Sequence, residues 1–257
     1  MPFNNKTTRT PTGTTNAAPW QTMANCGSQD PTWVHEYFND FNTYLASDWT
    51  VTVVGSGTSA VTPFDGGALL STTSGASGDS LYYQLAAAGF KLGSAVTPPK
   101  DTFFKFSGVL SDVVASTFYA GFIITSATPL AATDGLYIYK ANGSSALSLV
   151  SKIAGVTTTA PFPTLCAPLA ATQFEVGIHV DYLGNVEAFW NPSTGDNPVG
   201  YAQAALNQPV GRVATLLQTG AAAVVTPQLL NLSFGVQTNA AAAKTLTTDF
   251  IVAERHR

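Results

Sequence analysis

The chain has 257 residues, of which 45% are hydrophobic and only 10% are charged, whereas about 25% of residues carry charge in an ordinary soluble protein. Its eleven Lys and Arg are scattered and the formal net charge is −4, which excludes nucleic acid as an expected partner because phosphate binding needs clustered positive charge. The apolar runs are too short for a membrane helix, and the first residues lack the apolar segment of a signal peptide. We therefore expect neither a membrane partner nor secretion through a cleaved leader.

Residues 1–30 are predicted to form an extended N-terminal arm. They are rich in Thr, Asn, Pro and Gly and show neither strand nor helix periodicity, so they bury too little surface to offset their conformational entropy. Trp20 and Met23 stand out as large apolar residues, and we expect them to bind a partner. The alternative is that they pack on the chain's own domain, which is predicted to span residues 31–257.

From residue 33 the sequence changes to short β-branched and aromatic segments separated by Gly, Pro, Asp, Asn and Ser, which is typical of strands joined by turns. The expected strands cover 49–54, 67–72, 80–85, 102–107, 118–124, 135–139, 174–181, 186–190, 212–217, 229–236 and 248–253. No long segment has helical periodicity. The fold class predicted is therefore all-β, a single two-sheet antiparallel β-sandwich.

The clearest local pattern is a β-hairpin between residues 174 and 190. The even positions from 174 to 180 are Phe, Val, Ile and Val, while Glu175, His179 and Asp181 occupy odd positions. The chain then turns through Gly184 and Asn185, which tolerate positive φ, into a second apolar strand. One face of this hairpin is expected to be buried.

The last expected strand alternates Phe250 and Val252 with Asp249, Ile251 and Ala253. Because alternating apolar residues indicate a strand with a buried face, we expect this segment to be an integral part of the sandwich.

Candidate catalytic residues are sparse. There are three histidines, His35, His179 and His256, and no serine lies in a Gly-x-Ser-x-Gly elbow. Among the acids, Glu175, Asp181 and Glu187 come nearest to a glycosidase pair, but Glu175 and Asp181 are six residues apart, about 20 Å along a strand. We interpret them as solvated charges and expect no catalytic residue.

Metal ligands and cofactor motifs are equally scarce. The candidate oxygen-rich loops for Ca²⁺ are Asn39–Asp40 near Glu36, and 194–197, and neither has the ligand density of a calcium loop. Cys26 and Cys166 lie far apart and are expected to be inert thiols rather than metal ligands. We expect no metal and no cofactor.

Aromatic residues could stack on a sugar, and the candidates are Trp33, Trp49, Trp190, Tyr137 and Tyr139. Most of these rings are expected in the core, where large aromatic side chains dominate packing. Trp190, at the end of the hairpin and just before Asn191-Pro192, is the best candidate for an exposed ring.

Several short motifs, in order, resemble the concanavalin-like (laminin-G-like) jelly rolls of tailed-phage virion proteins. They are 39–41, Trp49 with 55–58, 65–70, 118–124 with 134–139, the hairpin 174–190 and the ending 248–255. In that fold the closing strand lies beside the first strand, which is what the resemblance implies for residues 248–255.

The resemblance implies a capsid decoration, or cement, protein that binds the outer surface of the major capsid protein and contacts copies of itself, often as a homotrimer. Such a protein is made in the host cytoplasm and is located on the virion. The sparse charge agrees, because a nearly neutral surface suits a molecule packed against neighbours.

The same fold also carries lectins and laminarinase-type glucanases, so the fold does not determine the function. The glucanase signature Glu-x-Asp-x-x-Glu is missing from this chain, and we therefore expect a non-enzymatic protein. The alternative function is a glycan-binding module displayed on a particle for host attachment.

Overall fold

The computed structural model describes residues 34–63, 67–86, 89–93, 99–191, 211–218 and 224–256. The predicted arm, with Trp20 and Met23, lies outside these residues. Within the described part, strands alternate with short connections, and the helical elements are the 3₁₀ turns η2 (Ala46–Asp48) and η3 (Pro129–Ala131). None of the helices described there has the length and hydropathy needed to cross a membrane.

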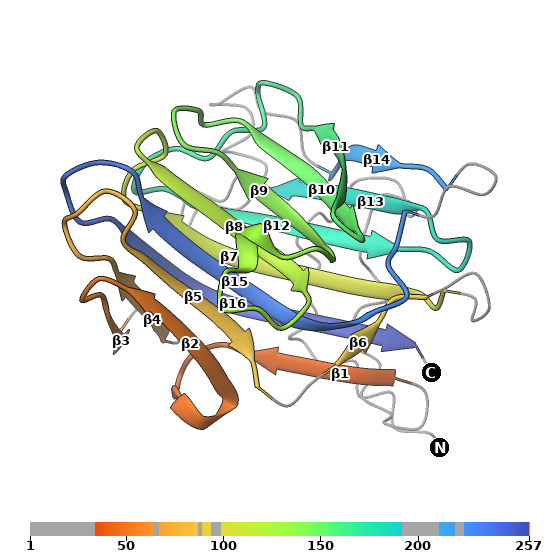
Figure 1. Cartoon of the computed structure of the whole chain (residues 1–257), viewed down its shortest axis with the longest axis horizontal. Helices are drawn as coiled ribbons and strands as arrows, with labels where there is room; N and C mark the ends of the chain where they lie inside the picture. Colours follow the sequence, from red (N-terminus) through yellow and green to blue (C-terminus); the bar gives the residue numbers. More distant parts are fainter. Residues whose placement is uncertain are drawn as a thin grey trace, which may run out of the picture.

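Two antiparallel sheets lie face to face, and Figure 1 looks through both layers. The first sheet has the order β14 (Gly211–Leu216), β13 (Val186–Asn191), β12 (Gln173–Val180), β7 (Thr102–Leu110), β16 (Thr245–His256), β4 (Ala68–Thr72) and β3 (Thr58–Thr62), and β1 (Val34–Asn39) also pairs with β16. The predicted fold class is confirmed by this arrangement.

The second sheet has the order β11 (Val156–Pro161), β10 (Leu147–Ile153), β9 (Gly135–Lys140), β8 (Ser116–Ile123), β15 (Leu229–Thr238), β5 (Ser80–Leu85) and β2 (Trp49–Val54). The short strand β6 (Phe90–Lys91) also pairs with β15. Strands distant in sequence are therefore neighbours in both sheets, as when β15 lies between β5 and β8.

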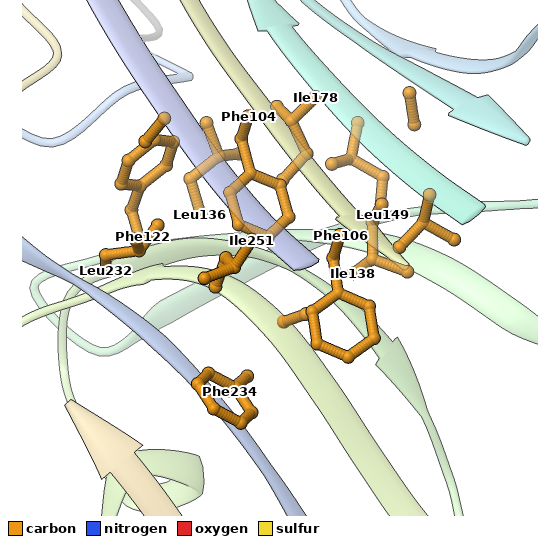
Figure 2. Packing of buried hydrophobic residues seen from close by; sticks show 14 of the residues in the cluster. Phe104, Phe106, Phe122, Leu136, Ile138, Leu149, Ile178, Leu232, Phe234 and Ile251 are labelled. Atoms are coloured by element: carbon orange, nitrogen blue, oxygen red, sulfur yellow. The ribbon is translucent and has the colours of Figure 1, made fainter. Parts of the chain in front are cut away.

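The core fills the space between the sheets because alternate side chains of each strand point inward. Figure 2 shows Phe104, Phe106 and Ile178 of the first sheet among residues of the second. Tyr83 stacks on Phe234 with ring centroids 4.6 Å apart. Across the gap, the Tyr83 hydroxyl forms hydrogen bonds with the hydroxyls of Ser59 and Ser71, at 2.5 Å and 2.8 Å, so a buried polar group joins the two sheets.

The predicted hairpin is present as β12 and β13, with His179 opposite Glu187 in the register. Its turn is closed by Asp181, whose carboxylate accepts hydrogen bonds from the amides of Leu183 and Asn185 at 2.8 Å and 2.9 Å. Gly184 takes a positive φ of 86°, as the turn requires.

The closing strand lies beside the first, as the resemblance implies: β16 pairs with β1 along six residue pairs from Val34↔His256 to Asn39↔Ile251. Strands β1, β3, β6, β10 and β11 were not among the expected strands. Two of these, β3 and β11, lie at sheet edges and carry mostly exposed small or β-branched residues, so they lack the apolar alternation that predicts a half-buried strand.

Candidate functional site

The outer face of the first sheet collects charged and aromatic side chains. In β12 the odd positions face outward, which places Glu175 and His179 there, while β7 contributes Phe103 and Lys105. β13 adds Glu187 on the same face, because Glu187 pairs with His179. The alternation that buries the core residues therefore brings polar residues from separate strands together on the opposite side.

At the middle of this face lies a nearly buried ion pair. The Lys105 ammonium is 2.6 Å from a carboxylate oxygen of Glu175, with exposed fractions of 4% and 15%. The Asn191 amide donates to the same carboxylate at 3.0 Å, and the ammonium lies 5.3 Å from the centroid of the Phe250 ring. A single buried charge at this position would cost free energy because it has lost its contact with water. The ion pair offsets that cost for both residues.

Nearer one end of the face, the His179 ring stacks on Phe103, with centroids 4.5 Å apart and the rings within 1° of parallel. Its Nε2 is 3.4 Å from a carboxylate oxygen of Asp101, and its Nδ1 is 3.6 Å from one of Glu187. Glu187 also accepts a hydrogen bond from Arg212 at 2.5 Å. The hydrogen bond with His179, followed by the bond and charge of Arg212, keeps the pKa of Glu187 below its usual value against the opposing effect of burial.

A second histidine extends the arrangement. His256 Nδ1 is 3.9 Å from Asp101, and its Nε2 is 3.5 Å from Glu254. Carboxylates and imidazoles therefore alternate across this face, in the order Glu187 of β13, His179 of β12, Asp101 and His256 of β16. We call the accessible part of this arrangement the histidine band, and it consists of Asp101, His179, Glu187, Arg212 and His256, whose side chains are 20–41% exposed.

Comparison with solved structures identifies the architecture. The chain is similar to a protein of unknown function from Shewanella oneidensis MR-1, with a TM-score of 0.56, 11% identity and 88% and 87% of the two chains covered. It is also similar to peanut lectin, with a TM-score of 0.55, 8% identity and coverage of 87% and 98%. The chain has the concanavalin-like jelly-roll fold.

An endo-β-1,4-glucuronan lyase from the fungus Trichoderma reesei shares this jelly roll, with a TM-score of 0.54, 14% identity and coverage of 84% and 94%. No protein-family model and no curated protein matches the sequence. At 8–14% identity these likenesses show the fold alone, and a lectin and a lyase on one fold illustrate that the fold leaves the function open.

The acids singled out in the sequence have different roles in the jelly roll. Asp181 closes the hairpin turn, whereas Glu175 and Glu187 each form an ion pair on the sheet face. The interpretation of Glu175 as a solvated charge was wrong, because its side chain is only 15% exposed and pairs with the buried Lys105 of the neighbouring strand β7. Glu187 is 20% exposed and pairs with Arg212 of β14.

The three histidines are divided between two places. His179 and His256 meet at Asp101, whereas His35 of β1 lies against Phe90, with ring centroids 5.1 Å apart. Asp101, Phe103 and Arg212 were not among the predicted site residues. Phe103 and Arg212 stand in predicted strands and Asp101 directly precedes one, but which of these positions meet depends on strand order.

The expected exposure of Trp190 was wrong. Its side chain is 1% exposed and stacks on Phe174, with centroids 5.8 Å apart. Trp190 follows Val186 and Ala188 in the inward period of β13, and this alternation continues to the end of the strand. Trp49 and Tyr137 are also buried, Tyr139 is half-buried, and Trp33 lies outside the described residues.

Within the described residues, no group of three or more His, Cys, Asp and Glu side chains is arranged to hold a metal ion. The oxygen atoms of Asn39 and Asp40 instead accept hydrogen bonds from the neighbouring residues Phe41 and Asn42, and residues 194–197 lie outside the described part. Cys166 is buried, and burial raises the pKa of its thiol to about 11, which suits an unreactive side chain. Cys26 is not among the described residues.

Proposed function

We propose that this protein is a non-catalytic carbohydrate-binding module and that the histidine band is the accessible part of its binding face. The observation that carries the proposal is the grouping of half-exposed, mutually paired donors and acceptors on one sheet face, where stacking on the buried Phe103 ring holds the His179 imidazole. Polar groups fixed in this way can bond sugar hydroxyls. The lectin-like fold agrees with this proposal.

That Glu175 and Glu187 do not act as a catalytic pair is proposed from their spacing. Glu175 is opposite Asn191 in the hairpin register, four residues from Glu187 on β13, so the two carboxylates are about 13 Å apart along the strand direction. Acid pairs of glycosidases are about 5–9.5 Å apart. Both carboxylates are also paired with cations.

The charge balance indicates the class of sugar. The carboxylates of the band, Asp101 and Glu187, exceed its single permanent cation, Arg212, and the nearby pair of Lys105 and Glu175 is neutral overall. A uronate or sulfated chain would meet uncompensated negative charge, which disfavours binding. Neutral glycans are therefore the proposed ligands.

A glycan array followed by titration calorimetry tests this function. Neutral glycans are expected to bind, with affinity lowered about tenfold, or about 1.4 kcal/mol, in the His179→Ala and Arg212→Ala variants. Lys91→Ala, which removes an exposed lysine of β6 on the second sheet, is the matched control and should bind normally. An array without any bound glycan, or equal loss in the control, would contradict the proposal.

A second proposed role is that of a capsid decoration protein on the virion, binding the major capsid protein and further copies of itself as a homotrimer. It is supported by the resemblance of the sequence motifs and by the 10% content of charged residues, which suits packed surfaces. Co-sedimentation with purified capsids tests this second role. Binding to capsids both with and without bound glycan would support the two roles together, and the absence of binding would reject the capsid role.

A further inference from the structure

Lys140 breaks the pattern of its own strand. On β9 it follows Leu136 and Ile138 on the core-facing side, yet it carries a charge, and its side chain is completely buried. A charged residue at a core position is costly unless it is hydrogen-bonded. Such local departures from the pattern commonly mark a site with a specific role.

The Lys140 ammonium is surrounded by backbone carbonyls from two loops. It donates to the carbonyl oxygens of Val113, in the loop before β8, at 2.8 Å and of Ser116, the first residue of β8. It also donates to those of Ala141 and Ser144, both at 3.3 Å, from the loop after β9. Four carbonyl oxygens around one positive charge form the type of ligand set that binds a cation.

The same two loops are joined by one backbone bond, from the Gly143 amide to the Val114 carbonyl at 2.9 Å. The first loop is also tied by Asp112, whose carboxylate accepts from the amides of Val114 and Ala115 and pairs with Lys244. Loop residues 141–146 carry no ionisable side chain. Asp112, paired with Lys244, is therefore the charged group whose field reaches Lys140.

We propose that residues 113–116 and 141–144 form a cation site, filled by the chain's own Lys140 ammonium, which holds the two loops in one conformation. An ammonium supplies three donors and a charge to the four carbonyls, whereas a neutral amine supplies two weaker donors.

Ionisation of this group falls in an accessible range. Burial lowers the pKa of Lys140 to about 8, and the nearby Asp112 carboxylate acts in the opposite direction. Because the folded-state pKa lies below the ordinary value of 10.5, burying the charge costs free energy below pH 8, and that cost disappears as the pH rises toward 10.5. The ammonium is thus kept at a cost, which agrees with a conformational role rather than a contribution to overall stability.

Chemical rescue tests the site itself. Lys140→Ala should lower the protection of Gly143 about tenfold, and n-propylammonium, which replaces the missing atoms and the charge, should restore it. Tetramethylammonium, which cannot donate, and 1-propanol, which is uncharged, should not. Lys152→Ala is the matched control, because its half-buried ammonium binds the carbonyls of Leu130 and Ala132 in a different loop.

Two results of the rescue experiment would reject a cation site. One is full protection of Gly143 in Lys140→Ala without any additive. The other is equal rescue by 1-propanol, which would mean that the side chain only fills space. If the variant does not fold, the ¹⁵Nζ signal of wild-type Lys140 decides the question: a protected three-proton ammonium at pH 7 supports the site, and rapid exchange with water rejects it.

Discussion

Asp112 shows how a single carboxylate organises a loop at the end of the sandwich. It accepts hydrogen bonds from the amides of Val114 and Ala115, both at 2.8 Å, and lies 2.6 Å from the Lys244 ammonium. The Lys244 bond, followed by these amides, lowers its pKa to about 2. The bonds favour the ionised form, so the loop is stabilised only while Asp112 is charged.

The lowered pKa of Asp112 predicts a loss of stability in acid. Its folded-state pKa lies below the ordinary 3.8, so its contribution is complete above about pH 4 and disappears as the pH falls to about 2. After a discount for solvent screening we expect a contribution of about 1 kcal/mol. Urea unfolding at several pH values should show a smaller decrease for Asp112→Asn than for the wild type.

The variant Lys244→Ala provides the comparison for Asp112. It removes the ion pair but keeps the two turn amides, so it should retain part of the acid sensitivity. Parallel curves for the wild type and Asp112→Asn between pH 4 and pH 2 would show that Asp112 does not produce the effect.

At the scale of elements, β16 is the strand on which the first sheet depends. Its twelve residues pair with β1, β4 and β7. Ile251 and Ala253 point into the main core, while Phe250 and Val252 pack with Phe103 on the other face. β16 is a central strand because it is paired along both of its edges, and both of its faces are covered as well.

Truncation after Thr248 is expected to abolish folding. The deletion removes the register from Phe250 to Arg255 with β7 and all of the pairing with β1, and it leaves a large apolar gap in the core. Circular dichroism and calorimetry should show no cooperative transition. Removal of residue 257 alone is the control and should behave as the full chain does. A truncated protein that melts within about 2 °C of the wild type would contradict this, since about 1 kcal/mol shifts the melting point by roughly 2–4 °C in a chain of this size.

For the whole molecule, the remaining feature is the predicted N-terminal arm and its proposed part in binding a partner. Residues 1–30, with Trp20 and Met23, are predicted to be an arm that binds a partner, and they lie outside the described residues. Deletion of residues 1–30 is expected to leave the melting point of the sandwich nearly unchanged. If the proposed capsid role holds, the deletion should weaken binding to capsids, because repeated attachment through several copies amplifies a weak contact.

Two measurements check the arm. Differential scanning calorimetry compares the stability of the deleted and full chains, and co-sedimentation with capsids compares their binding. The double substitution of Trp20 and Met23 by Ala keeps the length of the arm and serves as the matched variant. If the deleted chain binds capsids as tightly as the full chain, residues 1–30 have no role in attachment.

Much of the architecture could be predicted because alternation is a local property. The side-chain period of a strand is two residues, so the inward and outward faces of β12 and β13, the turn at Gly184 and the all-β class follow from neighbouring residues. The closing strand was identified in the same way from Phe250 to Ala253. The strands β3 and β11 were missed because most of their residues are exposed and show no apolar alternation, and such strands form only where a paired neighbour provides a ladder of hydrogen bonds.

The histidine band depended on tertiary structure. Asp101, His179 and Arg212 belong to segments more than thirty residues apart, and they meet only because β7, β12, β13 and β14 are consecutive in the sheet. The order of strands results from how the whole chain buries its apolar surface, and no local pattern contains it. The carbonyl site around Lys140 has the same origin, because its ligands are backbone atoms, which every residue has. Local alternation specifies which side of each predicted strand is apolar, whereas strand order and packing select the polar groups that meet on the other side.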